Sequence, residues 1–303
     1  MRRVVSLLIA LALVGLVSWP VRTQAQTQAP AKEVPELRQR LAERLAKPNA
    51  AEVQLQNARA RALGLAGAKP AAKPAARPPV AWGYTGEGAP EHWGELAPEN
   101  RLCAVGTRQS PIDLRDTLKV DLEPIQFDYR DGGFTVLDTG HTIQLTLPPG
   151  NGLTVRQRRY ELQQVLFRRP AEERINGRGF DMGVHLIHRD ARGRTAIVAV
   201  LLQQGEQDQP VVQKVWNHLP LEKLQPEQVP SGLNLADLLP HARGYFTFMG
   251  SLTTPPCSED VLWMVMREPV TVSSQQLAVF TRLYPMNARP IQPAAGRIVK
   301  ESF

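Results

Sequence analysis

Residues 81–303 are predicted to fold as a mainly β domain, with one large, mostly antiparallel sheet and short helices around it. Short apolar segments alternate here with turns rich in Gly, Pro, Asn and Asp, which is typical of strands joined by short connections. Helices are expected to be short, as at 233–240 and 273–284, and no internal repeat is visible. The apolar segments lie at 134–147, 152–157, 160–167, 179–190, 195–205, 260–266 and 268–272.

The segment 195–205 differs from the others because its sequence, TAIVAVLLQQG, begins with an almost unbroken apolar run. Successive side chains of a strand point to opposite faces, so a strand that is apolar at every position is covered on both sides. We therefore expect 195–205 to be a central strand of the sheet.

The first 25 residues are predicted to be a secretory signal. Arg2 and Arg3 precede the apolar run VVSLLIALALVGLVSW, and the small-residue end Thr23-Gln24-Ala25 follows, with cleavage expected after Ala25. The alternative is an uncleaved membrane anchor, although the apolar run is short for a membrane span. The paired arginines alone are weak evidence for export of a folded protein. Cleavage predicts a periplasmic or secreted protein that is not integral to the membrane.

Residues 26–80 are predicted to be a helical segment followed by a linker rich in Pro, Ala and Lys. Leu37, Leu41 and Leu45 recur every four residues and give a helix at 35–47 one apolar face, and 50–65 could form a second helix. The stretch 67–80 is a semi-rigid linker with spaced cations. This segment is either a solvated spacer or a handle, through 35–65, for self-association or contact with an anionic envelope surface.

The net charge of +7 belongs to the front of the chain. Residues 26–80 carry ten Lys and Arg against four Asp and Glu, whereas residues 81–303 carry 23 against 25. The β domain as a whole therefore gives no support to nucleic-acid binding.

Cys103 and Cys257 are the two cysteines of the chain. An even number of cysteines in an exported protein predicts a disulfide, and closing so long a loop is worth about 4–5 kcal/mol in the chain-entropy model. The alternative is two separate free thiols.

Two neighbouring strands contain the beginnings of a metal site. Leu166 and Arg168 share one face of the strand that includes 162–168, and His185 would lie across the ladder from them. Zinc needs three or four N, O or S ligands, and only His185 is of a suitable type. A single strand histidine is usually a structural residue.

Seven motifs follow one another along residues 82–303. They are WGY (82–84), HWGEL (92–96), QSPIDL (109–114), TGHTIQL (139–145), INGRGFDM with HLIH (175–188), GSLTTPPCSE (250–259) and NARPIQP (287–293). With these motifs in this order, residues 82–303 resemble an α-class carbonic anhydrase of the bacterial periplasmic type. The resemblance covers about three-quarters of the chain and implies a central ten-stranded, mainly antiparallel sheet and a Cys103–Cys257 disulfide.

The family reaction, reversible hydration of carbon dioxide, uses zinc held by three histidines to lower the pKa of bound water. By resemblance, Leu166 and Arg168 stand where the first two ligands would be, and His185 is the third. Gly183 replaces the acidic residue that orients that third ligand. We therefore predict no cofactor, because zinc is expected of the family but its ligands are missing.

Other positions of the family's site are retained, so the resemblance implies a vestigial apparatus. Thr253 and Glu172 match the pair that orients the zinc-bound hydroxide, and His141 matches the proton shuttle. His188 matches a buried structural histidine. The remaining pocket positions are Gln164, which supports the first ligand, Thr254, and the apolar carbon dioxide wall of Ile197, Leu252, Val261 and Trp263.

Arg168 allows three interpretations. It could be a rim arginine, or its guanidinium could fill the former metal volume and pair with Glu172, since a buried charge must be paired. It could also hold bicarbonate or another small carboxylate beside Thr253 and His185.

The sequence predicts an exported binding or assembly module without conventional carbon dioxide hydration. Its partner would be an unidentified protein or an anionic envelope component. One alternative is an active zinc carbonic anhydrase with an atypical site. The other is a binder of an anionic envelope or glycan polymer through the basic segment at 26–80.

Overall fold

The structure of the chain is a computed structural model that describes residues 54–55, 58–59 and 80–303, except for the side chain of Ser231. The predicted signal, cleavage site and linker, and almost all of the segment predicted to be helical, lie outside the described residues. Within the described part, no helix is both long enough and apolar enough to cross a membrane.

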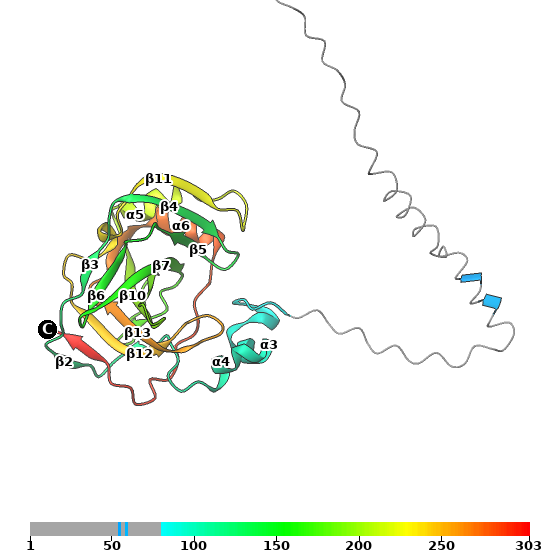
Figure 1. Cartoon of the computed structure of the whole chain (residues 1–303), viewed down its shortest axis with the longest axis horizontal. Helices are drawn as coiled ribbons and strands as arrows, with labels where there is room; N and C mark the ends of the chain where they lie inside the picture. Colours follow the sequence, from blue (N-terminus) through cyan, green and yellow to red (C-terminus); the bar gives the residue numbers. More distant parts are fainter. Residues whose placement is uncertain (1–53, 56–57, 60–79) are drawn as a thin grey trace, which may run out of the picture. The chain divides into compact units, whose positions relative to one another are not determined.

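One large sheet organises residues 80–303 (Figure 1). Its main path has ten strands in the order β11-β4-β5-β7-β9-β10-β13-β12-β15-β2, with β3, β6 and β14 attached beside it. The strands are β1 (Asp113–Leu114), β2 (Leu118–Val120), β3 (Gln126–Asp128), β4 (Gly132–Asp138), β5 (Ile143–Thr146), β6 (Gly152–Val155), β7 (Arg158–Arg168), β8 (Arg174–Ile175), β9 (Met182–Arg189), β10 (Thr195–Gly205), β11 (Glu227–Leu233), β12 (Tyr245–Ser251), β13 (Glu259–Met266), β14 (Val270–Ser273) and β15 (Lys300–Ser302).

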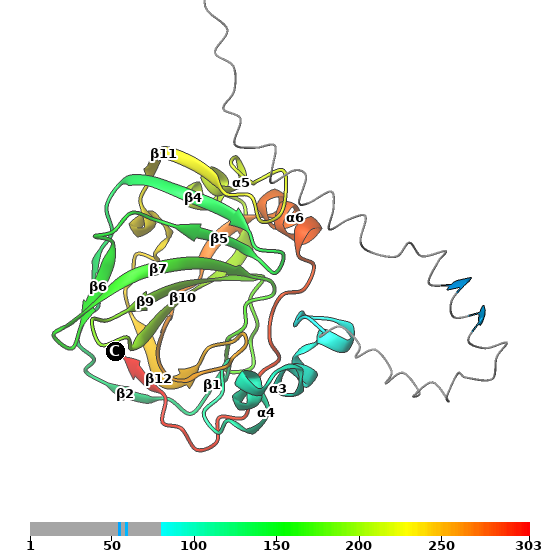
Figure 2. The same ribbon diagram turned by 45° about the vertical axis from the view of Figure 1, so that its right-hand side comes forward.

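The predicted large, mainly antiparallel sheet is therefore confirmed, with ten strands along its main path and thirteen in all within the described part of the chain. Most neighbouring strands run antiparallel, including β7 with β9 and β9 with β10. Parallel pairing occurs between β10 and β13, β10 and β14, and β15 and β2, while β1 and β8 form a small parallel sheet of their own. Figure 2 shows β11, β4, β5 and β7 following one another across the domain.

The strand β10 lies in the middle of this sheet, as its apolar run predicts. Its alternate side chains enter two different hydrophobic clusters. Ala196, Val198, Val200 and Leu202 belong to the larger cluster, and Ile197, Ala199 and Leu201 belong to the smaller one. Period-two alternation on a strand that is buried on both faces accounts for the lack of polar residues at 196–202.

Short helices complete the domain. The helix at 274–283 begins with a capping box, in which the Ser273 hydroxyl accepts from the Gln276 amide and the Gln276 side chain accepts from the Ser273 amide. The helix at 210–216, whose N-cap is Gln209, was not predicted from the sequence. The helices are η1 (Gly86–Gly88), η2 (Pro90–His92), α3 (Trp93–Leu96), η3 (Pro98–Arg101), α4 (Leu102–Val105), α5 (Pro210–Trp216), η4 (Leu235–Leu238) and α6 (Ser274–Leu283).

Helices α5 and α6 cover the larger cluster. Trp216 of α5 and Phe280 of α6 stack with 5.6 Å between their ring centroids. Phe167 of β7 packs against both rings, which connects the helical layer to the sheet directly beside Leu166 and Arg168.

The predicted disulfide between Cys103 and Cys257 is present, with 5.1 Å between the Cα atoms. It joins α4, which contains Cys103 and directly follows η3, to the turn that follows β12. Cys257 is fully buried. The bond therefore fixes the N-terminal helical turns of the domain against the loop that contains Thr253.

Candidate functional site

The pairing of β7 with β9 assembles the residues that the sequence singled out. Leu166 lies opposite His185, and Arg168 lies opposite Gly183. On its other side β7 pairs with β5, where Gln144 faces Leu166. This pairing agrees with the prediction that His185 lies across the ladder from Leu166 and Arg168, and a bulge interrupts it between Leu162 and Gln164.

The carboxylate of Glu172, in the loop after β7, contacts most of the other polar groups of this site. Its Oε2 accepts from the Thr253 hydroxyl at 2.5 Å and lies 3.3 Å from Arg168 Nε and 3.5 Å from His185 Nδ1. Its Oε1 accepts from the Arg289 backbone amide at 2.7 Å. The side chain is completely buried, so these contacts replace its hydration.

Arg168 is a buried cation and not a rim residue. It is 2% exposed, and its Nη1 donates to the Tyr84 hydroxyl at 3.2 Å. Burial disfavours its charge, but the nearby Tyr84, Glu172 and Glu173 outweigh burial and raise the pKa of the guanidinium. Burial, opposed by Arg168, raises the pKa of Tyr84 to about 12, so the phenol is neutral at physiological pH.

His185 has an orienting carboxylate, which the sequence reading did not anticipate. Its Nε2 lies 3.2 and 3.3 Å from the two carboxylate oxygens of Glu173, so both ring nitrogens face acidic groups. The orienting role expected to be lost with Gly183 is thus filled from the neighbouring loop. The signal was present in the consecutive acids Glu172 and Glu173, but only the fold shows that they reach different atoms of the same ring.

A glycine at position 183 fits the local packing. A Cβ atom there would lie 3.4 Å from both the Cα and the Cβ of Ala171. A Cβ atom would thus fit in ordinary contact, and a larger side chain would extend from a position already packed against Ala171.

Two of the three positions matched to zinc ligands carry side chains that do not donate to zinc. Leu166 has no donor atom, and the Arg168 guanidinium is a cation that pairs with Glu172. Among the described residues, no three His, Cys, Asp or Glu side chains are arranged to hold a metal ion. The cluster contains instead a guanidinium and an imidazole facing two carboxylates.

The positions matched to the carbon dioxide wall lie together around Trp263. Ile197, Val261 and Trp263 belong to the smaller hydrophobic cluster, and Leu252 packs against it. The rings of His185 and Trp263 meet edge to face at 5.1 Å. Gln164 and Thr254 are half-buried, and the Thr254 carbonyl accepts from the Cys257 amide.

His141 lies farther out and stacks on Trp82. Their ring centroids are 3.8 Å apart with an angle of 12° between the planes. Partial burial, followed by the positive charges of Arg168 and Lys223, lowers the pKa of His141. His188, by contrast, is fully buried beyond the site, where its Nε2 lies 2.9 Å from the Tyr129 hydroxyl.

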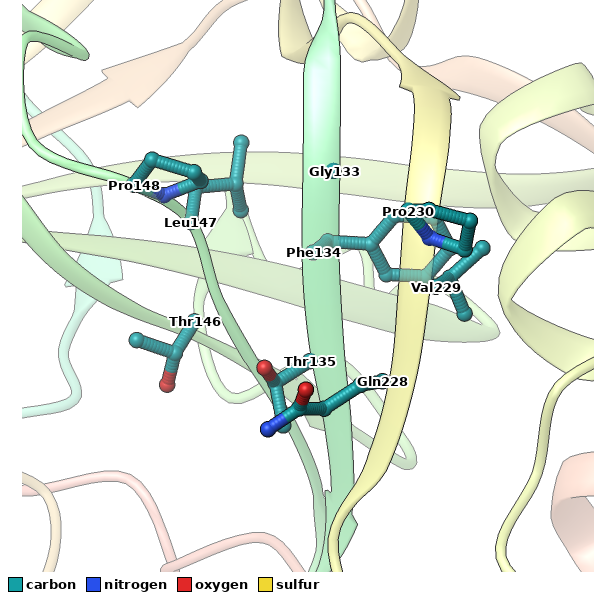
Figure 3. A pocket seen from close by; sticks show the side chains of 9 residues that line it. All are labelled: Gly133, Phe134, Thr135, Thr146, Leu147, Pro148, Gln228, Val229 and Pro230. Carbon is teal, nitrogen blue, oxygen red and sulfur yellow. The ribbon is translucent and has the colours of Figure 1, made fainter.

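Two cavities differ in their relation to this site. One, of about 290 Å³, opens beside Tyr84, Glu172 and Arg174. The other, of about 490 Å³, is a shallow groove at the sheet edge between β4, β11 and the turn after β5 (Figure 3). Phe134, Leu147 and Pro230 line this groove, which contains none of the residues matched to the family's site.

Known proteins resemble this chain over the whole β domain. Residues 88–303 match the family model described as eukaryotic-type carbonic anhydrase. A carbonic anhydrase of Klebsiella pneumoniae is 41% identical over 223 residues, which cover 73% of this chain and 90% of the relative.

Solved structures show the same similarity. The α-carbonic anhydrase of Thermovibrio ammonificans, in complex with sulfanilamide, has a TM-score of 0.70 at 37% identity and covers 73% of this chain and 98% of its own. Dioscorin in complex with ascorbate has a TM-score of 0.69 at 28% identity, with the same coverage.

Proposed function

Because this chain belongs to the eukaryotic-type, or α, carbonic anhydrase family, we propose that it is a member that has exchanged zinc chemistry for binding. It would act as an exported binding or assembly module, in the periplasm or outside the cell, and would not hydrate carbon dioxide by the family's zinc-hydroxide route. The export rests on the signal read from residues 1–25.

The observation that carries this proposal is the buried ion pair between Arg168 and Glu172. A guanidinium at a metal-ligand position stays protonated and repels a divalent cation, and Leu166 offers no electron pair at the other position. The acids beside it already have other partners, since Glu172 contacts Arg168 and Thr253, and Glu173 contacts His185. A zinc ion would have to displace these contacts with one imidazole as its only neutral protein ligand.

The binding role is supported by the cavity of about 290 Å³ beside Glu172. Dioscorin, a protein of the same fold, holds ascorbate in its solved structure. A carbonic anhydrase fold can therefore carry a small organic ligand. The hypothesis that Arg168 itself holds a small carboxylate gains no support from the geometry, because two carboxylates already surround its guanidinium.

Zinc content and carbon dioxide hydration test the proposal. We expect the purified full chain, after exposure to zinc and dialysis, to retain less than stoichiometric metal by mass spectrometry. Stopped-flow hydration with a pH indicator is expected to stay at the uncatalysed rate. Stoichiometric zinc together with rapid hydration would establish the other possibility, an active enzyme with an atypical site.

A repair variant tests the structural reasoning behind the proposal. The double variant Leu166→His and Arg168→His should bind zinc, because residues 166 and 185 face each other and Glu173 already orients His185. Adding Gly183→Glu should bring no further affinity, because it introduces a third buried acid close to Ala171. If only the triple variant takes up zinc, Glu173 does not support the imidazole. If neither folded variant takes up zinc, the three positions do not converge.

A further inference from the structure

The near-neutral charge of the β domain conceals a local concentration of arginine. The stretch VRQRR at 155–159 and the stretch RDARGR at 189–194 contain six arginines and one acid, Asp190. None of these arginines belongs to the site around Glu172. The domain's overall balance of 23 basic and 25 acidic residues therefore says little about this region.

The sheet brings the two stretches together. β6 and β7 form a hairpin in which Val155 pairs with Arg158, and the turn residues Arg156 and Gln157 both have positive φ. The neighbouring connection is the turn at 190–194, which joins β9 to β10 and begins where Arg189 pairs with Thr195. Since β7 also pairs with β9, the hairpin lies beside the turn at 190–194. This end of β7 is about 33 Å along the strand from Arg168.

A cavity of about 210 Å³ lies between these two connections. Arg156 and Arg158 of the hairpin and Arg194 of the turn line it, and Met249 and Leu262 add apolar surface. Arg158 and Arg194 are 43% and 42% exposed, and Met249 is 39% exposed. The cavity thus combines accessible cations with a patch that can pack against C–H groups.

The two acidic residues near this cavity, Asp190 and Asp260, already form hydrogen bonds or ion pairs within the protein. Asp190 is buried and accepts from the backbone amides of Arg192 and Arg194 and from Arg194 Nε at 2.7 Å, while Arg158 Nε lies 3.7 Å away. Asp260, at the rim, pairs with Arg108 at 2.7 Å.

Arg156, Arg189 and Arg192 have no carboxylate within salt-bridge distance among the described residues. Their positive charge is available to a ligand. The potential of this surface is therefore positive although the domain is not.

We propose that this cavity, with the arginines around it, binds an anionic polysaccharide, with carboxylate groups on the guanidinium side chains and sugar C–H faces on Met249 and Leu262. A single small anion would contact only one or two of these arginines, whereas a charged polysaccharide chain could contact several of them at once. Nucleic acid is disfavoured because single strands are held by stacking on aromatic side chains. The aromatic residue among those described as lining the cavity is Tyr160, which is only 3% exposed.

This site is independent of the zinc question and of the basic segment at 26–80, so its test can fail separately from the proposed function. Titration calorimetry with an alginate hexasaccharide measures binding to the full chain at 50 and 200 mM salt. We expect binding that weakens with salt, and no binding of a dextran oligomer of the same length. Arg156→Gln with Arg158→Gln should weaken binding about tenfold, since each exposed ion pair contributes modestly.

The control variants keep the same change of charge elsewhere. Arg101→Gln with Arg282→Gln should leave the affinity unchanged within about twofold. Arg156→Gln alone, at an exposed turn position without an acidic partner, should still weaken binding and preserves a readout if the double variant does not fold. No binding by the wild type, or equal binding by both cavity variants, overturns the proposal.

Two further outcomes would contradict the assignment. Loss of binding on neutralising Lys69, Lys73 and Arg77 to Gln, with the cavity variants unaffected, would move the site to the front of the chain. Tighter binding of a single-stranded DNA oligomer of equal charge would replace the ligand class.

Discussion

Removing the charge of Arg168 is the most direct perturbation of the buried cluster. Arg168→Met keeps an apolar side chain of comparable length but leaves the Glu172 carboxylate, which is 0% exposed, without its cation. The attraction lost over 3.3 Å is about 5 kcal/mol at an effective dielectric constant near 20. Breaking a buried pair on one side typically costs about 3–5 kcal/mol, and we expect the free energy of unfolding to fall by that amount.

The assay is urea unfolding of the oxidised protein at pH 7, followed by tryptophan fluorescence. Arg168→Met combined with Glu172→Gln removes both charges, and the amide can still accept from the Arg289 backbone. We expect the double variant to be more stable than Arg168→Met by at least about 1 kcal/mol, because the Glu172 charge is removed together with its partner. The exposed Arg174→Gln serves as the control and should change stability by less than about 0.5 kcal/mol.

Two results would refute this reasoning. A loss below about 1 kcal/mol for Arg168→Met would mean that Glu172 is well compensated without the arginine. Additive effects of the two substitutions would mean that the residues are not energetically coupled, whatever their distance in the structure.

Two other predictions follow from the buried groups of the domain. Burial lowers the pKa of His188 to about 3 from 6.5, so the unfolded chain binds a proton between these pH values that the folded chain does not. The contribution of His188 to the free energy of unfolding should therefore be fully present above pH 6.5. Below that pH it should fall by up to about 1.4 kcal/mol per pH unit. Urea unfolding at pH 7, 6 and 5 should show a shallower decline in His188→Gln, and an equal decline would contradict the assignment. Reduction of Cys103–Cys257, which spans 154 residues, should cost about 5 kcal/mol, measured as a lower urea midpoint in dithiothreitol. An unchanged midpoint after verified reduction would reject it.

Much of the sheet could be predicted from local pattern. The unbroken apolar run at 196–202 indicated a strand covered on both faces, and β10 has this environment because its alternate residues enter two separate clusters. The helix α5 was missed, because seven residues that begin with proline and include three valines look equally compatible with a strand.

The part of the site that lies on the paired strands β7 and β9 could be predicted from the sequence. Face alternation in two adjacent strands was enough to predict that Leu166 and Arg168 share a face, with His185 across the ladder, whereas the pairing of Arg168 with Gly183 is given by the structure. Glu173 could not be found in this way, because it lies in an irregular loop where no periodicity relates a side chain to its direction. The same limit hid Tyr84, which reaches Arg168 from 84 residues earlier in the chain.

The sequence by itself determined the family, the strand alternation and the absence of two imidazoles, because residue type and period-two spacing are local properties. Only the tertiary structure decided what fills their place. It turns the Arg168 guanidinium inward to Glu172, supplies Glu173 to His185, and gathers separate arginines around one cavity far from that cluster. Charge pairing and burial depend on distances between segments remote in sequence, and such distances are set by the packing of the whole sheet.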